Sequence, residues 1–503
     1  MNAIPVSSWH IERGARLTTT ASSVRTLLSQ TPRHDSSALA VSDATRNLTW
    51  AALRRESDQI HKALAGAGIA EGQRVVCALP PSVNFVVLLA AVLRLGATLV
   101  PIHPATRSDE VHSLATEVEA MLIVSDEADH AVSAADAIPT AAYSTLKAGG
   151  LSTRLSRRRQ AKEVAFVIFT SGTTSAPKGV VCDDSQVSYA LGAIQSVVKY
   201  TGNDVVLSRL PVSFDYGLYQ VLLAMLSGAQ VVFLPEGHDA RAATIIDRHR
   251  VTILPIVPSM VEMLALSAGR ASPDLSSVRL VTSTGERLAV KRQETLYSLF
   301  PNACIAAMYG VTECKRVSIE ILARGVVGDH SGFPLPGTRV AIVDADLGSV
   351  PRGSSGEIVV IGHTVTAGYW GGSAHGSMRF ARTRSGDRLL FTGDHGFFDR
   401  DGRLHVIGRD DGLVKVRGIR VSAARVEEAA MAIEGVQLAV LLQHAQQEAT
   451  LWVETSQSPA IIRQDLLRRL PSTHVPRAVR CVAAFPLTAN GKVDRNALVG
   501  EEE

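Results

Sequence analysis

Hydrophobic and polar residues alternate along the first hundred positions with a spacing that switches between helical and extended. Apolar residues recur at helical intervals over 53–67, and Gly68 ends this helix. The apolar run 74–79 predicts a short strand, 85–95 predicts a buried helix, and 97–101 predicts the next strand. The chain therefore begins with strand–helix–strand units.

The same pattern returns over 204–235 and again over 251–284. Repeated units of this kind predict parallel sheets covered by helices. Near residue 400 the pattern changes to a compact strand–helix segment that continues to the end of the sequence. We therefore expect a large domain over 1–408 and a small domain over 412–503, joined by a hinge at 409–411.

Composition narrows the class of protein. The 503 residues are 46% hydrophobic and 20% charged, which is typical of globular proteins, and the net charge of +3 favours neither nucleic acid nor a membrane surface as a partner. The five cysteines form no C-x-x-C pair, which indicates a reducing compartment without structural zinc. The longest apolar stretch, 85–93, is too short to span a bilayer, and the N-terminus lacks the apolar core of a signal peptide. We expect a soluble cytoplasmic protein, with the basic run 154–162 as a solvated linker.

The stretch FTSGTTSAPKG at 169–179 follows an apolar run of strand type. Hydroxyls and glycine amides in a tight loop donate to phosphate oxygens, and a lysine adds a mobile positive charge, so this composition suits a nucleoside triphosphate. The spacing differs from that of the P-loop. The alternative is a flexible Ser/Thr/Gly surface turn. The candidate phosphate-binding residues are Thr170, Ser171, Gly172, Thr173, Thr174 and Lys178.

This stretch resembles the signature of the adenylate-forming superfamily, which comprises acyl-CoA synthetases, luciferases and the adenylation domains of nonribosomal peptide synthesis. Its members activate a carboxylic acid with ATP and Mg²⁺, release pyrophosphate and pass the acyl-AMP to a thiol. The resemblance extends over roughly 45–497, although Ser175 replaces the usual Gly and Asp184 replaces a common His. It implies an α/β fold: a large N-terminal domain of parallel or mixed sheets packed with helices, a small β-barrel-like subdomain, and a small mobile α+β C-terminal domain.

Further motifs follow in the order of the superfamily, although each alone is an ordinary turn. In Met308–Glu313 the resemblance implies that Tyr309 contacts adenine, that Thr312 contacts the α-phosphate, and that Glu313 binds Mg²⁺, a hard cation that prefers oxygen ligands. Asp394 would accept both ribose hydroxyls, as an ionised acceptor can. The implied ATP or AMP contacts outside the loop are Thr284, Gly285, Glu286, Tyr309, Gly310, Asp394, Arg409 and Arg420.

The C-terminal motifs imply a moving lid. Asp411 matches the superfamily hinge, about which the small domain rotates between the two half-reactions. Gly418 matches the glycine that lets a pantetheine arm pass. Lys492 follows an Asn-Gly turn and would hold the substrate carboxylate and the bridging oxygen, so the implied catalytic residues are Lys492, Thr312 and Glu313.

The segment LPVSFDYG at 210–217 matches the substrate pocket, with Phe214, Asp215, Gly217 and Cys314 as its candidate lining. In amino-acid-activating members a Phe-Asp pair here supplies a carboxylate to the substrate amine, and a cationic ligand would explain a buried aspartate. Alternatively, Asp215 faces solvent or caps a helix. Lys315 and Arg316 favour an acid with an extra negative group, or an ion pair with the small domain. Cys314 is expected to line the pocket and not to act as a nucleophile.

The acceptor and the acid remain open. The chain carries no fused carrier or condensation domain, so we expect a separate acceptor, either CoA or a phosphopantetheinylated carrier protein. Our main hypothesis is a stand-alone amino-acid or acyl ligase that loads a carrier protein. The alternatives are an acyl-CoA ligase for a fatty or aryl acid, a non-catalytic nucleotide-binding scaffold, and a luciferase-like oxygenase. Arg425-Val-Glu427 departs from the usual E-(I/V)-E form, which weakens any assignment to a subclass.

Overall fold

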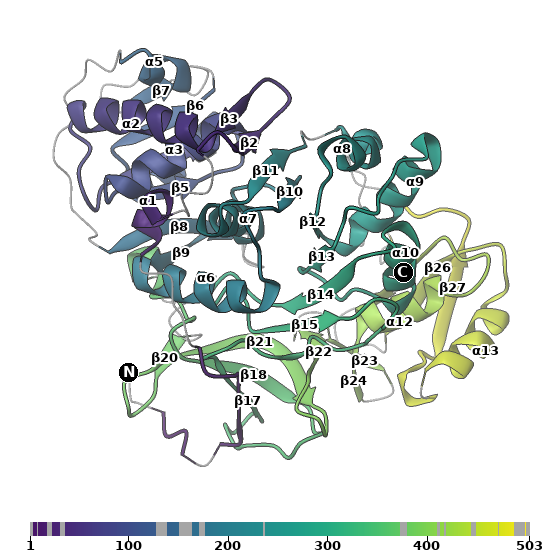
Figure 1. Cartoon of the computed structure of the whole chain (residues 1–503). Coiled ribbons are helices and arrows are strands. Elements are labelled where there is room, and N and C mark those ends of the chain that lie inside the picture. Colours follow the sequence, from purple (N-terminus) through teal and green to yellow (C-terminus); the bar gives the residue numbers. More distant parts are fainter. Residues whose placement is uncertain are drawn as a thin grey trace. The chain divides into compact units, whose positions relative to one another are not determined.

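The structure is a computed structural model (Figure 1). It describes residues 4–7, 9–17, 23–30, 36–126, 138–149, 163–170, 177–234, 237–372, 380–409, 413–416, 419–443, 449–470, 472–486 and 498. The chain forms two compact units. The first contains Met1–Ser354, Val359–Thr392 and Phe398–His405, and the second contains Ser355–Ile358, Gly393–Phe397 and Val406–Glu503. A large sheet-rich N-terminal part with a smaller C-terminal part confirms the expected α/β fold class.

A nine-stranded sheet forms the centre of the first unit. Its strand order is β16-β15-β14-β13-β12-β10-β11-β2-β3, and the strands from β14 to β2 run parallel. The bounds are β2 (Leu39–Ser42), β3 (Asn47–Thr49), β10 (Val205–Ser208), β11 (Gln230–Phe233), β12 (Ile253–Ile256), β13 (Leu280–Ser283), β14 (Cys304–Tyr309), β15 (Ser318–Leu322) and β16 (Phe333–Pro334). The strand–helix units predicted over 204–235 and 251–284 are confirmed.

Helices cover both faces of this sheet. They are α6 (Asp184–Val198), α7 (Asp215–Ser227), α8 (Ala242–His249), α9 (Val261–Ala271) and α10 (Val290–Leu299). Successive strand residues enter different cores: Val206 packs in the core that contains α6 and α7, whereas Leu207 packs in the core that contains α8, α9 and α10. Burial on both faces accounts for the nearly continuous apolar runs of these strands.

A second sheet of seven strands has the order β19-β9-β8-β5-β4-β6-β7. Its bounds are β4 (Arg74–Ala78), β5 (Thr98–Pro101), β6 (Leu122–Ser125), β7 (Thr140–Ala142), β8 (Val164–Thr170), β9 (Lys178–Asp183) and β19 (Gly368–Tyr369). Its helices are α2 (Trp50–Gly66), α3 (Val83–Arg94), α4 (Ser108–Glu117) and α5 (Tyr143–Lys147). The elements predicted over the first hundred residues are confirmed. Thr49 caps α2 by accepting from the Ala52 amide, and α3 is almost entirely buried.

A third sheet corresponds to the small β subdomain expected from the sequence. Its strands are β1 (Ile11–Arg13), β17 (Arg339–Val343), β18 (Gly356–Ile361), β20 (Phe380–Arg382), β21 (Arg388–Phe398) and β22 (Leu404–Arg409). Each of β18, β21 and β22 runs through a division between the two units.

The remaining elements of the second unit are short. They are β23 (Leu413–Val416), β24 (Ile419–Ser422), α12 (Ala423–Met431), β25 (Leu438–Leu442), β26 (Thr450–Glu454), α13 (Pro459–Arg469) and β27 (Ala478–Val482). Val426, Leu451 and Leu466 contribute to a core of its own. The boundary expected at 409–411 stays a prediction.

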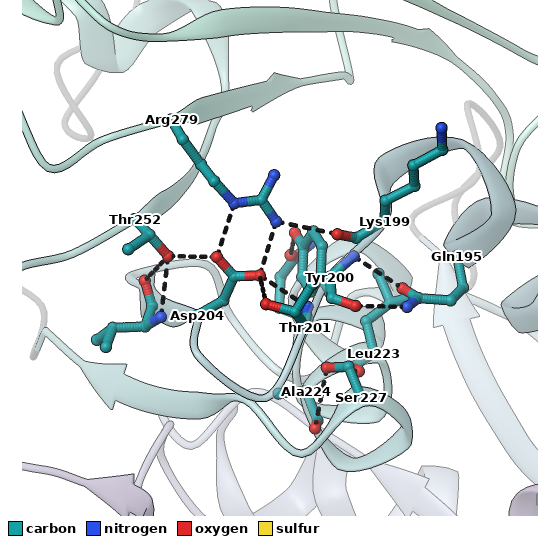
Figure 2. A network of polar contacts seen from close by, with 12 residues as sticks. Gln195, Lys199, Tyr200, Thr201, Asp204, Leu223, Ala224, Ser227, Thr252 and Arg279 are labelled. Atoms are coloured by element: carbon teal, nitrogen blue, oxygen red, sulfur yellow. Dashed lines mark hydrogen bonds and ion pairs between the residues drawn. The ribbon is translucent and has the colours of Figure 1, made fainter.

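An ion pair between buried Asp204 and exposed Arg279 joins the amino ends of three central strands (Figure 2). Asp204 precedes β10, Thr252 precedes β12 and Arg279 precedes β13. Arg279 Nε and Nη2 donate to the two carboxylate oxygens of Asp204 at 2.7 and 2.6 Å. Thr252 Oγ1 and the Thr201 amide each donate to the same carboxylate at 2.7 Å. We call these four residues the Asp204 clamp.

The described part of the chain contains no helix with both the length and the apolar character needed to cross a membrane.

Candidate functional site

Several of the predicted motifs follow the carboxyl ends of neighbouring parallel strands. The segment 210–217 follows β10, Thr284 follows β13 directly, and Tyr309 ends β14. In the sheet order β14-β13-β12-β10 these ends meet at one edge, opposite to the Asp204 clamp. Ligands of open α/β sheets bind outside the carboxyl ends of the strands. The topology therefore brings motifs that are distant in sequence to one edge.

Tyr369 connects the predicted phosphate loop to Glu313. Thr170 and Lys178 are paired across the β8–β9 hairpin, where the loop begins and ends. Lys178 Nζ lies 5.8 Å from the centroid of the Tyr369 ring, and the Tyr369 hydroxyl donates to Glu313 Oε1 at 2.7 Å. The pairing of β19 with β9 places Tyr369 there. The loop residues Ser171, Gly172, Thr173 and Thr174 lie outside the described residues.

Sequence reasoning missed Tyr369. A tyrosine after a glycine carries no signal of its own, and it reaches Glu313 only because β19 pairs with a strand from much earlier in the chain. The two residues that it joins were both predicted, Lys178 from the loop and Glu313 from the later motif.

The turn after β14 is compact. The Val311 carbonyl accepts from the amides of Cys314 and Lys315 at 3.0 and 2.7 Å. A Cβ at Gly310 would lie 2.1 Å from the Lys315 carbonyl oxygen, so only glycine fits here without a backbone shift. Thr312 is half-buried, and Glu313 is 7% exposed.

The donor set of this site fits a phosphate-bound magnesium ion. Glu313 supplies one carboxylate, and its Oε1 accepts from a tyrosine that can orient it. Within the described residues no group of three or more His, Cys, Asp and Glu side chains could hold a metal. Mg²⁺ commonly takes one or two carboxylates and completes its shell with substrate phosphates and water. A single glutamate near the predicted phosphate loop agrees with that pattern.

Two buried basic side chains, Lys315 and Arg316, follow Glu313, and Arg316 is paired with Asp215. Arg316 Nη1 is 3.4 Å from Asp215 Oδ2, and the Arg316 guanidinium carbon is 4.8 Å from the centroid of the Tyr216 ring. The side chains of Arg316 and Asp215 are only 5% and 13% exposed. Lys315 is 1% exposed, and its Nζ donates to Cys182 Sγ at 3.1 Å.

These contacts revise two expectations. Asp215 was expected to be a buried aspartate that only a cationic substrate would pair. In the structure Arg316 already provides a cationic partner. The ion pair of Arg316 with Asp215 lies within the first unit. Asp215 also stands in the first turn of α7, where a negative charge favours the helix, but no side chain caps this helix through a hydrogen bond.

The other predicted pocket residues differ in their surroundings. Phe214 is 48% exposed. A Cβ at Gly217 would lie 2.2 Å from the Pro211 carbonyl oxygen, so this glycine lets α7 begin against the preceding segment. Cys314 is fully buried, and burial raises its pKa to about 12. Its thiol is therefore neutral at physiological pH, and its role in the pocket stays a prediction.

The remaining predicted residues are only partly described. Thr284 is buried and Glu286 is exposed, with Gly285 between them. Asp394 is 5% exposed and lies in the part of β21 that belongs to the second unit. Arg409 lies in β22 and Arg420 lies in β24. Asp411, Gly418 and Lys492 lie outside the described residues, so their roles stay predictions.

Comparison with known proteins gives a consistent picture. Residues 28–370 match the family model described as AMP-binding enzyme. Tyrocidine synthase 3 of Brevibacillus parabrevis is 28% identical over 486 residues, and the match covers 92% of this chain and 7% of that protein. The chain spans between 6% and 26% of the length of the curated relatives it matches.

Solved structures are also similar. VinN in complex with L-aspartate is 30% identical, with a TM-score of 0.66, and the match covers 79% of this chain and all of that chain. ATP-bound MatB from Rhodopseudomonas palustris has a TM-score of 0.78 over 96% of this chain and 99% of that chain. Its 23% identity supports the fold alone.

Proposed function

Because this chain belongs to the AMP-binding enzyme family, we propose that it activates an amino acid with ATP and transfers the acyl group to a phosphopantetheine thiol on a carrier protein. The carboxylate forms an acyl-AMP as pyrophosphate leaves, and the thiol then displaces AMP. The observation that carries this proposal is the connection from Lys178 through Tyr369 to Glu313, which joins the phosphate loop to the proposed magnesium ligand.

The first half-reaction brings two negative charges together, because a carboxylate must approach the α-phosphorus of a polyanion. Lys178 and the loop hydroxyls would offset the phosphate charge, and Thr312 would donate to the α-phosphate. A Mg²⁺ ion held by Glu313 would bridge phosphate oxygens and offset their charge. Lys492 would hold the carboxylate and the bridging oxygen. Preorganised donors of this kind commonly contribute a factor of about 10²–10³ each to the rate.

The second half-reaction requires a different arrangement, since Lys492 occupies the site during the first. Rotation about Asp411 would withdraw Lys492 and admit the pantetheine arm past Gly418. The acyl–phosphate bond then breaks as the thioester forms, with AMP as the leaving group. No nucleophilic side chain of the protein takes part.

The surroundings of Asp215 support an amino acid over a fatty or aryl acid as the substrate. Asp215 presents a carboxylate to a substrate ammonium, and the buried charges of Arg316 and Lys315 are unsuited to an alkyl chain or an aromatic ring. A structure similar to this chain contains L-aspartate, which is an amino acid. These observations support amino-acid activation, with CoA in place of the carrier protein as the alternative acceptor.

The test is exchange of labelled pyrophosphate into ATP over a panel of amino, aryl and fatty acids. We expect exchange with an amino acid, and a loss of at least about 100-fold in Glu313→Gln, as for removal of a preorganised group that stabilises the transition state. The exposed control Glu294→Gln should match the wild type. Exchange with fatty or aryl acids alone would replace the proposal by an acyl-CoA ligase, and no exchange with any acid would indicate a nucleotide-binding scaffold. Thioester formation with CoA or with a phosphopantetheinylated carrier then identifies the acceptor.

A further inference from the structure

Of two adjacent buried cations, Lys315 and Arg316, only Arg316 is bonded to a carboxylate in the described part of the chain. Lys315 and Arg316 are both nearly inaccessible to solvent, and the only carboxylate bonded to either of them among the described residues is that of Asp215. Lys315 Nζ donates to a thiol, Cys182 Sγ. Burial raises the pKa of Cys182 despite the neighbouring lysine, so the thiol does not supply a compensating negative charge.

The carboxylates nearby have other partners. Asp183 Oδ2 accepts from Arg388 at 2.6 Å, and Glu313 Oε1 accepts from the Tyr369 hydroxyl. A buried charge without a counterion is costly, and an oppositely charged ligand group offsets part of that cost. The buried cations Lys315 and Arg316 are therefore suited to a negatively charged group of the substrate.

The distance between Arg316 and Asp215 restricts where the negatively charged group of the substrate can lie relative to its ammonium. Their charged atoms are 3.4 Å apart, beyond the length of about 2.7–2.9 Å that is usual for a charge-assisted bond. The bond within the pair is thus long, while Arg316 Nη1 also donates to the Lys315 carbonyl oxygen at 2.6 Å, which holds the guanidinium next to Asp215. A substrate that gives its ammonium to Asp215 and a carboxylate to Arg316 must carry these two groups side by side, as on one carbon atom.

We propose that the substrate is an amino dicarboxylic acid whose ammonium and non-reacting carboxylate, both on the α-carbon, are bound by Asp215 and by Arg316 with Lys315. The distal carboxylate is then the one that reacts. Its oxygen bonds to the α-phosphorus of ATP, the bond from that phosphorus to the leaving pyrophosphate breaks, and the product is the distal acyl-AMP. This inference rests on the proposed function and specifies which acid is activated and through which carboxyl group.

The reaction product tests the choice of carboxyl group. L-Aspartate is the smallest acid with this pattern, and hydroxylamine traps its adenylate as a hydroxamate. We expect the β-hydroxamate, identified by mass-spectrometric fragmentation against both synthetic isomers. L-Asparagine, whose distal group is an amide, should support no exchange. The α-hydroxamate, or exchange with L-asparagine, would overturn the inference while leaving amino-acid activation intact. No exchange with any acid would instead overturn the proposed function.

Variants test the role of Arg316. In Arg316→Gln we expect the kcat/KM ratio of L-aspartate over 3-aminobutanoate, which lacks the second carboxylate, to fall about 10- to 100-fold, as expected for loss of a charged hydrogen bond. The control Arg248→Gln, an exposed change on α8, should leave the ratio unchanged. A shift in melting temperature on adding ATP shows that the variant is folded. An unchanged ratio in folded Arg316→Gln would exclude Arg316 as a ligand of the second carboxylate.

Discussion

At the scale of single residues, the Tyr369 hydroxyl determines how Glu313 is presented. Its bond of 2.7 Å fixes one carboxylate oxygen and thereby the orientation of the whole carboxylate group. The Tyr369 ring also lies near the ammonium of Lys178, so one side chain orients both a cation and an anion of the proposed site. Tyr369 is therefore a positioning residue.

The variant Tyr369→Phe tests this role because it removes the hydroxyl and keeps the ring near Lys178. A hydrogen bond to a charged group is worth about 1.5–3 kcal/mol, so we expect kcat/KM for ATP to fall about 10- to 100-fold and the requirement for Mg²⁺ to increase. Pyrophosphate exchange at varied ATP and Mg²⁺ concentrations measures both effects. An exchange rate within about twofold of the wild type at every Mg²⁺ concentration would contradict the assignment.

Local motifs made some of the site residues predictable and left others hidden. Lys178 and Glu313 stand in dense, distinctive segments, so the sequence points to them. The sequence did not predict that Arg316 pairs with Asp215. Arg316 reaches Asp215 through the tight turn that Gly310 permits, and this turn is a tertiary feature. Lys315 and Arg316 were identified as unusual, but their burial follows from tertiary packing, which local composition does not contain.

At the scale of elements, the Asp204 clamp joins the amino ends of the strands β10, β12 and β13. Burial opposes ionisation of Asp204, but hydrogen bonds from Arg279, Thr252 and Thr201 outweigh it and lower its pKa below the ordinary value of 3.8. The same contact, with Asp204 as acceptor, raises the pKa of Arg279. The apolar pattern predicted β10, β12 and β13 correctly, yet no local signal marks the ion pair that joins them.

We expect Asp204→Asn to lower the free energy of unfolding by about 2–3 kcal/mol at neutral pH, through loss of charged hydrogen bonds at a buried site. Because the folded pKa of Asp204 lies below its unfolded value, this stabilisation is present above pH 3.8 and is lost as the pH falls through the folded pKa. Denaturant unfolding of both proteins over a pH series measures the difference.

The control is Asp274→Asn, which breaks the exposed pair with Arg250 and should change stability little. A difference between wild type and Asp204→Asn that stays constant as the pH falls well below 3.8 would show that the charge of Asp204 is not the cause.

At the scale of the whole molecule, the chain forms two units that share the strands β18, β21 and β22. The order of the motifs made the superfamily predictable, because no single turn is specific but their succession is. The residues proposed to act from the second unit, above all Lys492, were inferred from that order, and their roles in the two half-reactions need a kinetic test.

We expect Lys492→Ala to abolish adenylation and to leave thioester formation from supplied acyl-AMP within a few-fold of the wild type. The reason is that Lys492 serves only the first half-reaction and is withdrawn before the second. Pyrophosphate exchange and thioester formation measure the two steps separately, with Lys62→Ala, an exposed change on α2, as the control. Equal loss of both steps would refute the proposed rotation.

The placement of the Asp204 clamp has a consequence for how such proteins diversify. Each strand that it fastens leads, at the far end, to a connection whose side chains can vary. Mutations that alter which molecule is chosen thus fall at strand ends that the clamp does not hold. Laboratory libraries confined to those connections, with Gly217, Gly310 and the pair of Asp215 with Arg316 kept, should yield a high fraction of folded clones.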